Sequence, residues 1–187
     1  MNVIKHRKQN RLNGFNYSSN GYYFVTICTK DREKYFGNII DNKMVLNNIG
    51  EIVNTCWLEI PNHFPNVELD EFQIMPNHVH MIIIINNKSN TKNKSPVGNK
   101  YFCSLQNINI SWQTKLSGSL SSVIRGFKIG VTKKCRTNNN KIIIWQKSFY
   151  DQIIRTEYSL YFIRQYIHDN PLNWESDRNN FNNKNKV

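Results

Sequence analysis

The sequence predicts an α+β domain built on one antiparallel sheet. Two observations indicate this class: strand-like and helix-like segments follow in the order β, α, β, β, α, β, α, and the two middle strands are joined by a tight turn. This order is the split βαβ arrangement of a ferredoxin-like sheet, with helices on one face and a further helix added at the C-terminal end. At 187 residues, the chain is long enough for one domain with a sizeable core.

Two segments in the first third of the chain have clear periodicity. Residues 21–29 (GYYFVTICT) are rich in aromatic and β-branched residues and follow turn-forming serines and asparagine, so we expect a strand. In residues 47–60, apolar residues recur at three- and four-residue spacing. That spacing predicts an amphipathic helix, which we expect to end at Pro61.

A hairpin is expected next. Residues 66–75 and 78–85 are two apolar runs joined by Pro76 and Asn77, a pair that favours a turn. The second run, HVHMIIII, is almost continuously apolar, which is typical of a strand buried on both faces of a sheet.

The segments after the hairpin are less regular. Residues 86–100 contain almost nothing apolar and are expected to form a mobile insertion, and residues 101–116 are ambiguous. Residues 117–135 predict a second helix, because they carry one apolar stripe at helical spacing. The stripe consists of Leu120, Val123, Ile124, Phe127 and Val131.

The last elements are a strand and a third helix. Residues 141–154 are strand-like, and Thr156 is a suitable N-cap for a helix over residues 157–170, which ends at Pro171.

These elements define one domain over residues 21–174, preceded by a basic arm at 1–20 and followed by a disordered tail at 175–187. The four cysteines are widely spread, which favours reduced thiols in a cytoplasmic protein. No apolar run approaches the ~20 residues of a membrane span, so we expect no membrane partner.

The charge balance indicates a polyanionic partner. The chain has 25 Lys+Arg against 13 Asp+Glu, a net charge of +12, and its 9 Tyr, 10 Phe and 4 Trp offer surfaces on which unpaired bases could stack. Nucleic acid is therefore the first partner to consider. The positive charge also has a second explanation. Asn, Ile and Lys are all heavily used, and a compositionally biased genome would produce this without selection for binding.

His78 and His80 stand two residues apart on the buried strand expected at 78–85. Residues two apart on a strand point to the same face, with Cα atoms roughly 6.5 to 7 Å apart, so two imidazoles could close around one metal ion. A pair of hydrogen-bonded core histidines fits the same pattern.

The third helix contains further candidates. Tyr166 and Asn170 lie four residues apart and would share a helix face about 6 Å from each other. An amide oxygen can complete a metal site and a phenol can attack a phosphate, but a tyrosine at this spacing is also typical of a packed core. Spacing alone does not choose among Tyr166 and the other tyrosines of the region, which are Tyr150, Tyr158 and Tyr161.

Five ordered blocks of the sequence resemble the REP-associated tyrosine transposases of the single-tyrosine HUH nuclease superfamily. The blocks are YYFVTICT, PNVELDEFQIMPNHVHMIIII, SVIRGFKIGVTKK, WQKSFYDQIIRTE and YIHDNPLNW. The resemblance runs from about residue 17 to residue 174. The superfamily is named after two histidines that flank a bulky hydrophobic residue, and these are here His78 and His80.

The resemblance implies roles for four residues of these blocks. Tyr166, in the block YIHDNP, would be the nucleophile, and His78, His80 and Asn170 would bind a divalent metal, with Mg²⁺ or Mn²⁺ favoured. Because Asn170 precedes Pro171, the helical distance from Tyr166 to Asn170 is only approximate. The implied reaction is cleavage and strand transfer of single-stranded DNA at repeat hairpins through a 5′-phosphotyrosine intermediate, by a monomer rather than a homodimer.

Basic residues would then contact the DNA backbone. The candidates are Arg125, Lys128, Lys133 and Lys134 on the second helix, and Arg7, Lys8 and Arg11 in the N-terminal arm. A charge run on a helix is also typical of a solvated face. The alternative function is a domesticated protein that binds repeat hairpins without cutting them.

Overall fold

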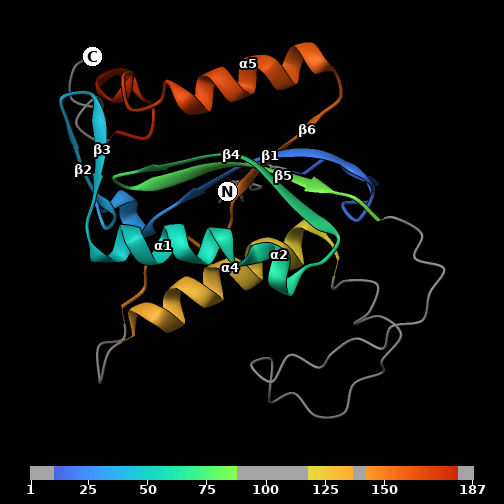
Figure 1. Cartoon of the computed structure of the whole chain (residues 1–187), viewed down its shortest axis with the longest axis horizontal. Coiled ribbons are helices and arrows are strands. Elements are labelled where there is room, and N and C mark those ends of the chain that lie inside the picture. Colours follow the sequence, from blue (N-terminus) through green and yellow to red (C-terminus); the bar gives the residue numbers. More distant parts are fainter. Residues whose placement is uncertain (1–10, 88–117, 137–141, 181–187) are drawn as a thin grey trace, which may run out of the picture.

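The computed structural model describes residues 11–87, 118–136 and 142–180 (Figure 1). Predictions for the arm residues 1–10, for most of the insertion and for the end of the tail lie outside these ranges. None of the described helices is long and apolar enough to cross a membrane.

The central sheet has four strands in the order β4-β5-β1-β6. They are β1 (Gly21–Cys28), β4 (Val67–Met75), β5 (His78–Ile85) and β6 (Tyr150–Ile154), and every neighbouring pair is antiparallel. This order confirms the predicted split βαβ sheet, in which the hairpin β4–β5 places β5 beside β1.

The helices lie on both faces of the sheet (Figure 1). One face is covered by α1 (Asn48–Leu58), α2 (Ile60–His63) and α4 (Leu120–Cys135), while α5 (Glu157–His168) lies across the opposite face. The helices of the ferredoxin-like unit therefore share one face, as predicted. Among the described helices, α5 alone covers the other face.

Side-chain alternation along the strands produces two cores. In β1, Tyr23, Val25 and Ile27 are fully buried in the larger core with α1 and α4. Phe24 points the other way into a smaller core, whose buried members are Phe24, Ile82, Ile154, Leu160 and Ile167. This smaller core holds α5 against the sheet.

A second hairpin, β2 (Gly37–Ile40) and β3 (Lys43–Leu46), was not predicted. Its two-residue turn has Asp41 and Asn42 at φ 49° and 59°, the left-handed region that a type I′ turn requires. The dipeptide Asp-Asn tolerates this conformation, so a turn signal was present in the sequence.

Four predicted boundaries differ from the structure. The third helix, expected to reach residue 170, ends at His168. The first helix ends at Leu58, and Pro61 stands in the first turn of α2, where its missing N–H costs nothing. Of the strand expected over residues 141–154, only the last part forms, as β6. In the earlier part, Trp145 forms an isolated bridge with Thr29.

The last difference concerns the C-terminal segment. Residues 175–180, expected in the tail, continue a packed turn that includes a short 3-10 helix, Trp174–Ser176. Asp177, Asn179 and Asn180 are all buried there. This turn brings polar side chains back to the sheet face that carries α5.

Removing part of the smaller core should loosen α5. Leu160 is 3% exposed, so Leu160→Ala is expected to lower the free energy of unfolding by about 2–5 kcal/mol in urea titrations. Leu172, which is 60% exposed, is the matched control, and Leu172→Ala should change this free energy by less than about 0.5 kcal/mol. Equal effects of the two substitutions would mean that Leu160 does not anchor α5.

Candidate functional site

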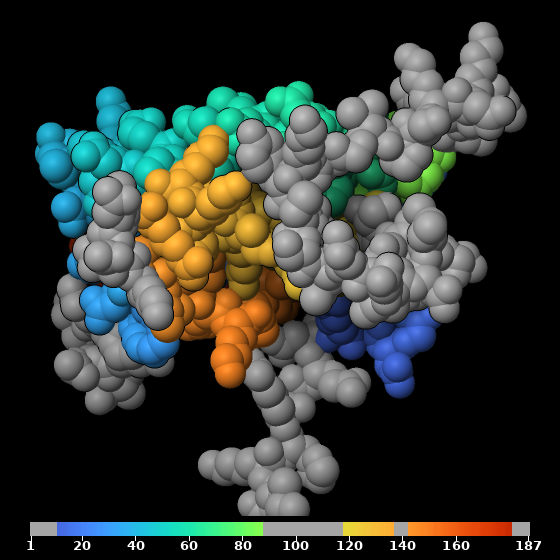
Figure 2. All heavy atoms as spheres, turned by 90° about the horizontal axis from the view of Figure 1, so that it is seen from below, coloured from blue at the N-terminus to red at the C-terminus, as the bar shows by residue number. Residues whose placement is uncertain are grey.

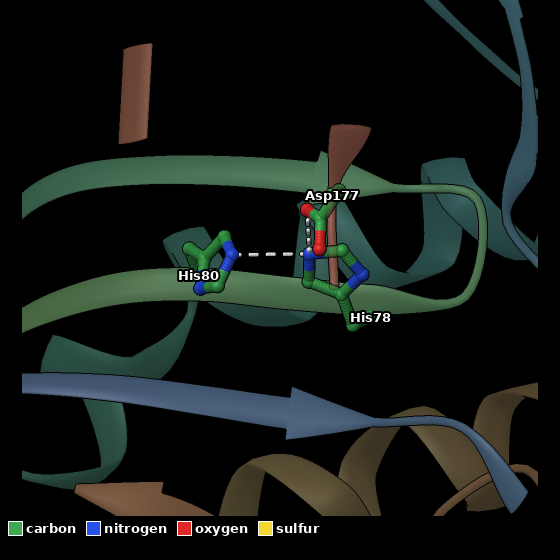
Figure 3. Close-up of side chains that lie close together, drawn as sticks. All are labelled: His78, His80 and Asp177. Atoms are coloured by element: carbon green, nitrogen blue, oxygen red, sulfur yellow. Dashed lines mark hydrogen bonds and ion pairs between the residues drawn. The ribbon is translucent and has the colours of Figure 1, made fainter. Parts of the chain in front are cut away.

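His78 and His80 lie together on β5, on the sheet face that α5 covers. Both imidazoles are fully buried, and their Nε2 atoms are 3.0 Å apart (Figure 3). Strand alternation explains the arrangement, since Val79 between them points into the larger core.

Asn77 fixes the orientation of His78. The Asn77 amide nitrogen donates to the backbone oxygens of Arg32 (3.2 Å) and Asn179 (2.8 Å), so the Asn77 Oδ1 atom must face His78. That oxygen lies 2.8 Å from His78 Nδ1 and can only accept. His78 Nδ1 therefore carries the proton, and in the neutral ring the Nε2 atom presents a lone pair.

His80 is held from the neighbouring strand. Thr26 pairs with His80 in the β1–β5 register, and its hydroxyl lies 2.9 Å from His80 Nδ1. When this nitrogen donates to the hydroxyl, the Nε2 lone pair of His80 also faces that of His78. Each ring is thus oriented by a partner on the nitrogen remote from the pair.

The facing nitrogens fit a metal ion. When both Nε2 atoms carry lone pairs, they repel each other at 3.0 Å unless a cation lies close to both; without a cation, Nε2–H of His80 can donate to His78 Nε2 at this distance. Adjacent nitrogen ligands, each about 2.1 Å from one ion, are separated by about 3 Å when they subtend a right angle. The separation in this pair matches that requirement.

Asp177 completes a His-His-Asp group that could hold a metal (Figure 3). Its Oδ2 atom is 3.5 Å from His78 Nε2, and one ligand atom from each of the three residues lies within 4.8 Å of the others. The backbone N–H of Asn179 donates to Asp177 Oδ1 at 2.6 Å, which fixes the carboxylate. Sequence reasoning missed Asp177 because it placed this residue in a tail.

Asn170, the predicted third ligand, lies beside the same group but outside α5. It is 2% exposed, and its Oδ1 atom has no hydrogen-bond partner among the described residues. Its side chain is close enough to affect the pKa of His78, Tyr166 and Asp177 through hydrogen bonding. An amide oxygen and a carboxylate oxygen are therefore both available near the histidines.

Tyr166 reaches the paired imidazoles from α5. Its hydroxyl is 3.4 Å from His80 Nε2, and its ring packs edge-on against His80 and Phe24. The residue is 43% exposed, so its phenol borders both the buried pair and solvent. Tyr158 and Tyr161, on the same helix, are 74% and 58% exposed, and within the described ranges neither is hydrogen-bonded to a histidine.

Burial controls the protonation states. Desolvation, together with the positive charge of Arg178, lowers the pKa of His80 to about 3, and desolvation also lowers the pKa of His78 well below its usual value. Both rings are therefore neutral at pH 7 and have lone pairs to offer. Burial and the nearby Asp177 carboxylate raise the pKa of Tyr166, so its phenol keeps its proton.

The basic residues of α4 lie on the other side of the sheet. Arg125, Lys133 and Lys134 are exposed on that helix, which is yellow in Figure 2 and packs with α1 into the larger core. Lys134 pairs with Glu59 at 2.7 Å. Lys128 is half-buried and donates to the backbone oxygens of Gln146 and Ser148. The structure does not bring these four residues to the histidines.

Of the three basic candidates in the arm, the structure describes only Arg11. Arg7 and Lys8 lie outside the described residues. Arg11 pairs with Asp151 at 3.3 Å, donates to Ser121 and lies over the rings of Tyr17 and Phe149. These contacts give Arg11 a structural role in joining the arm to the domain.

Comparisons with known proteins agree with this fold. No family model matches the chain. It is 42% identical over 175 residues to an uncharacterized protein of Haemophilus influenzae strain Rd, covering 94% of this chain and 93% of that protein. Among solved structures, a REP-associated tyrosine transposase bound to a REP hairpin matches with a TM-score of 0.54 and 18% identity, covering 92% of this chain and 74% of the other.

The chain therefore has the fold of a REP-associated tyrosine transposase, with a His-His-Asp group that could hold a metal. In sequence, it belongs to one family with the Haemophilus influenzae protein.

The depressed histidine pKa values predict a pH-dependent stability. The unfolded histidines bind protons near pH 6.5, whereas folded His80 does so only near about pH 3. Stability measured with a chelator should therefore be complete above about pH 6.5 and fall as the pH is lowered toward about 3, by up to ~1.4 kcal/mol per pH unit from His80.

The control is His80→Gln, which removes this titrating group. Urea titrations across the same pH window should give a shallower loss of stability for the variant than for the wild type. Parallel curves would show that His80 is not held neutral by the fold.

Proposed function

We propose that the protein cleaves and rejoins single-stranded DNA at repeat hairpins, with Tyr166 forming a transient 5′-phosphotyrosine link. The observation that carries this proposal is the Tyr166 hydroxyl, 3.4 Å from Nε2 of His80, beside two facing imidazoles. A nucleophile and a candidate metal centre thus meet on one sheet face.

A divalent cation, Mg²⁺ or Mn²⁺, is the cofactor in this proposal. His78 and His80 would hold it together with an oxygen from Asp177 or Asn170. A mixed nitrogen and oxygen ligand set with positions left for water can hold these ions, although two imidazoles would also accept Zn²⁺. When bound, the cation would polarise the scissile phosphate and stabilise the charge on its oxygens.

Tyr166 supplies the covalent chemistry. Its phenol oxygen forms a bond to phosphorus while the bond from phosphorus to the 3′ oxygen breaks, and the phenol proton is lost as the 3′-OH is formed. Because the unperturbed pKa of a phenol is near 10, far below that of an alcohol, the phenolate is also a good leaving group when a 3′-OH attacks in return. The linkage can therefore be made and reversed.

Several features support single-stranded DNA as the substrate. The chain has a net charge of +12, and the similar solved transposase is bound to a REP hairpin. Tyr166 is partly exposed, so an unpaired strand can approach it. One chain supplies the imidazoles and the phenol, so no second copy is needed to complete the site, which supports a monomer.

A second candidate is a domesticated protein that binds repeat hairpins without cutting. The grouping of His78, His80, Tyr166 and Asn170 favours cleavage, because hairpin binding alone does not require a phenol beside paired imidazoles. Nicking of a hairpin oligonucleotide with Mn²⁺ separates the two functions.

Tyr166→Phe should abolish the covalent adduct with a labelled single-stranded hairpin oligonucleotide in Mn²⁺, because the variant lacks the attacking oxygen. The adduct is read on denaturing gels, and hairpin binding should stay near the wild-type level. Tyr161→Phe, on the same helix, is the matched control and should form the adduct normally. An adduct that persists in Tyr166→Phe would assign the nucleophile to another residue.

A further inference from the structure

A polar pocket of about 330 Å³ opens next to the candidate metal centre. Its lining includes Thr26, Tyr150, Arg178 and Asn179. Two of these residues are shared with the histidine site: the Thr26 hydroxyl contacts His80 Nδ1, and the Asn179 backbone oxygen accepts from the Asn77 side chain that orients His78. The pocket and the metal centre therefore have a common wall.

Two arginines give the pocket its charge. Arg32 and Arg178 are the charged residues of its described lining, which contains no acidic side chain. Arg178 is exposed and lies over the ring of Tyr150, with 5.8 Å from its guanidinium carbon to the ring centroid. This arrangement favours an anionic ligand.

Asn179 provides an independent sign of a ligand. It is 4% exposed, and its Nδ2 atom has no hydrogen-bond partner among the residues that the structure describes. Its Oδ1 atom accepts from the Arg32 guanidinium, which fixes the amide so that the nitrogen is the group left to donate. A buried donor without an acceptor is costly, and an anion in the pocket would satisfy it.

We propose that this arginine pocket, formed by Arg32, Arg178 and Asn179, binds a phosphodiester group of the unpaired strand. This group is the neighbour, along the strand, of the phosphodiester group that lies at the metal centre. Charge-assisted hydrogen bonds from the guanidinium groups and the Asn179 amide would hold this phosphate. Tyr150, 39% exposed beside Arg178, offers a ring face to the attached base. The inference rests on the proposed function, because the pocket would bind the same DNA strand that is cleaved at the metal centre.

The test measures DNA binding without cleavage. Affinity for a fluorescent oligothymidylate is determined by anisotropy in a chelator, over a series of salt concentrations. Arg178→Ala should weaken binding about tenfold at low salt and reduce the slope of log affinity against log salt by about 0.7, the value for one lost phosphate contact on a single strand. Arg178→Lys keeps the charge and should keep most of the slope.

The matched control is Arg136→Ala, which removes an exposed arginine at the C-terminal end of α4, on the opposite face of the sheet. It should leave both affinity and slope unchanged. Wild-type affinity and slope in Arg178→Ala would overturn the proposal, and so would an equal loss in Arg136→Ala, since that would reflect net charge alone.

The outcome is separable from that of the proposed function. The wild type forming no covalent adduct in Mn²⁺ would exclude cleavage. If Arg178→Ala still lowers the slope of log affinity against log salt, and the control variant does not, the pocket stands. If the adduct forms and the slope is unchanged, the pocket is excluded and cleavage stands.

Discussion

The 3.0 Å contact between the Nε2 atoms of His78 and His80 is the constraint on which the rest of the site depends. Burial keeps both rings neutral, Asn77 directs the lone pair of His78 Nε2 toward His80, and the Thr26 hydroxyl contacts His80 Nδ1. A shared cation would stabilise the arrangement in which both lone pairs face each other. Sheet register, the tight turn before β5 and the packed C-terminal turn all serve to hold this contact.

The side chains on the same sheet face also determine where α5 packs. Even-numbered residues of β5 carry the histidines near its start and Ile82 farther along, so the smaller core and the polar site are parts of one surface. Leu160 and Ile167 anchor the helix on the apolar part, which leaves Tyr166 at the polar part. The proposed nucleophile is thus positioned by apolar packing.

Much of this fold could be predicted from local patterns. Period-two alternation placed His78 and His80 on one face, and Thr156 caps α5 as expected, accepting from the Ser159 N–H at 3.1 Å. Asp177 could not be predicted, because its approach to the histidines depends on a turn after Pro171 that has no periodicity. The place of the α4 charges in the fold could not be predicted for a similar reason: a helical pattern shows which residues are exposed but not which face of the sheet the helix covers.

The arginine pocket adjoins this surface, because Thr26 and Asn179 belong to both the pocket and the histidine site. The central claim is that the paired imidazoles bind a divalent cation. Anomalous diffraction from a crystal soaked in Mn²⁺ tests it most directly. A peak bonded to both Nε2 atoms and to an oxygen of Asp177 or Asn170 is the result we expect; the absence of a peak there, with Mn²⁺ bound elsewhere in the crystal, would contradict the claim.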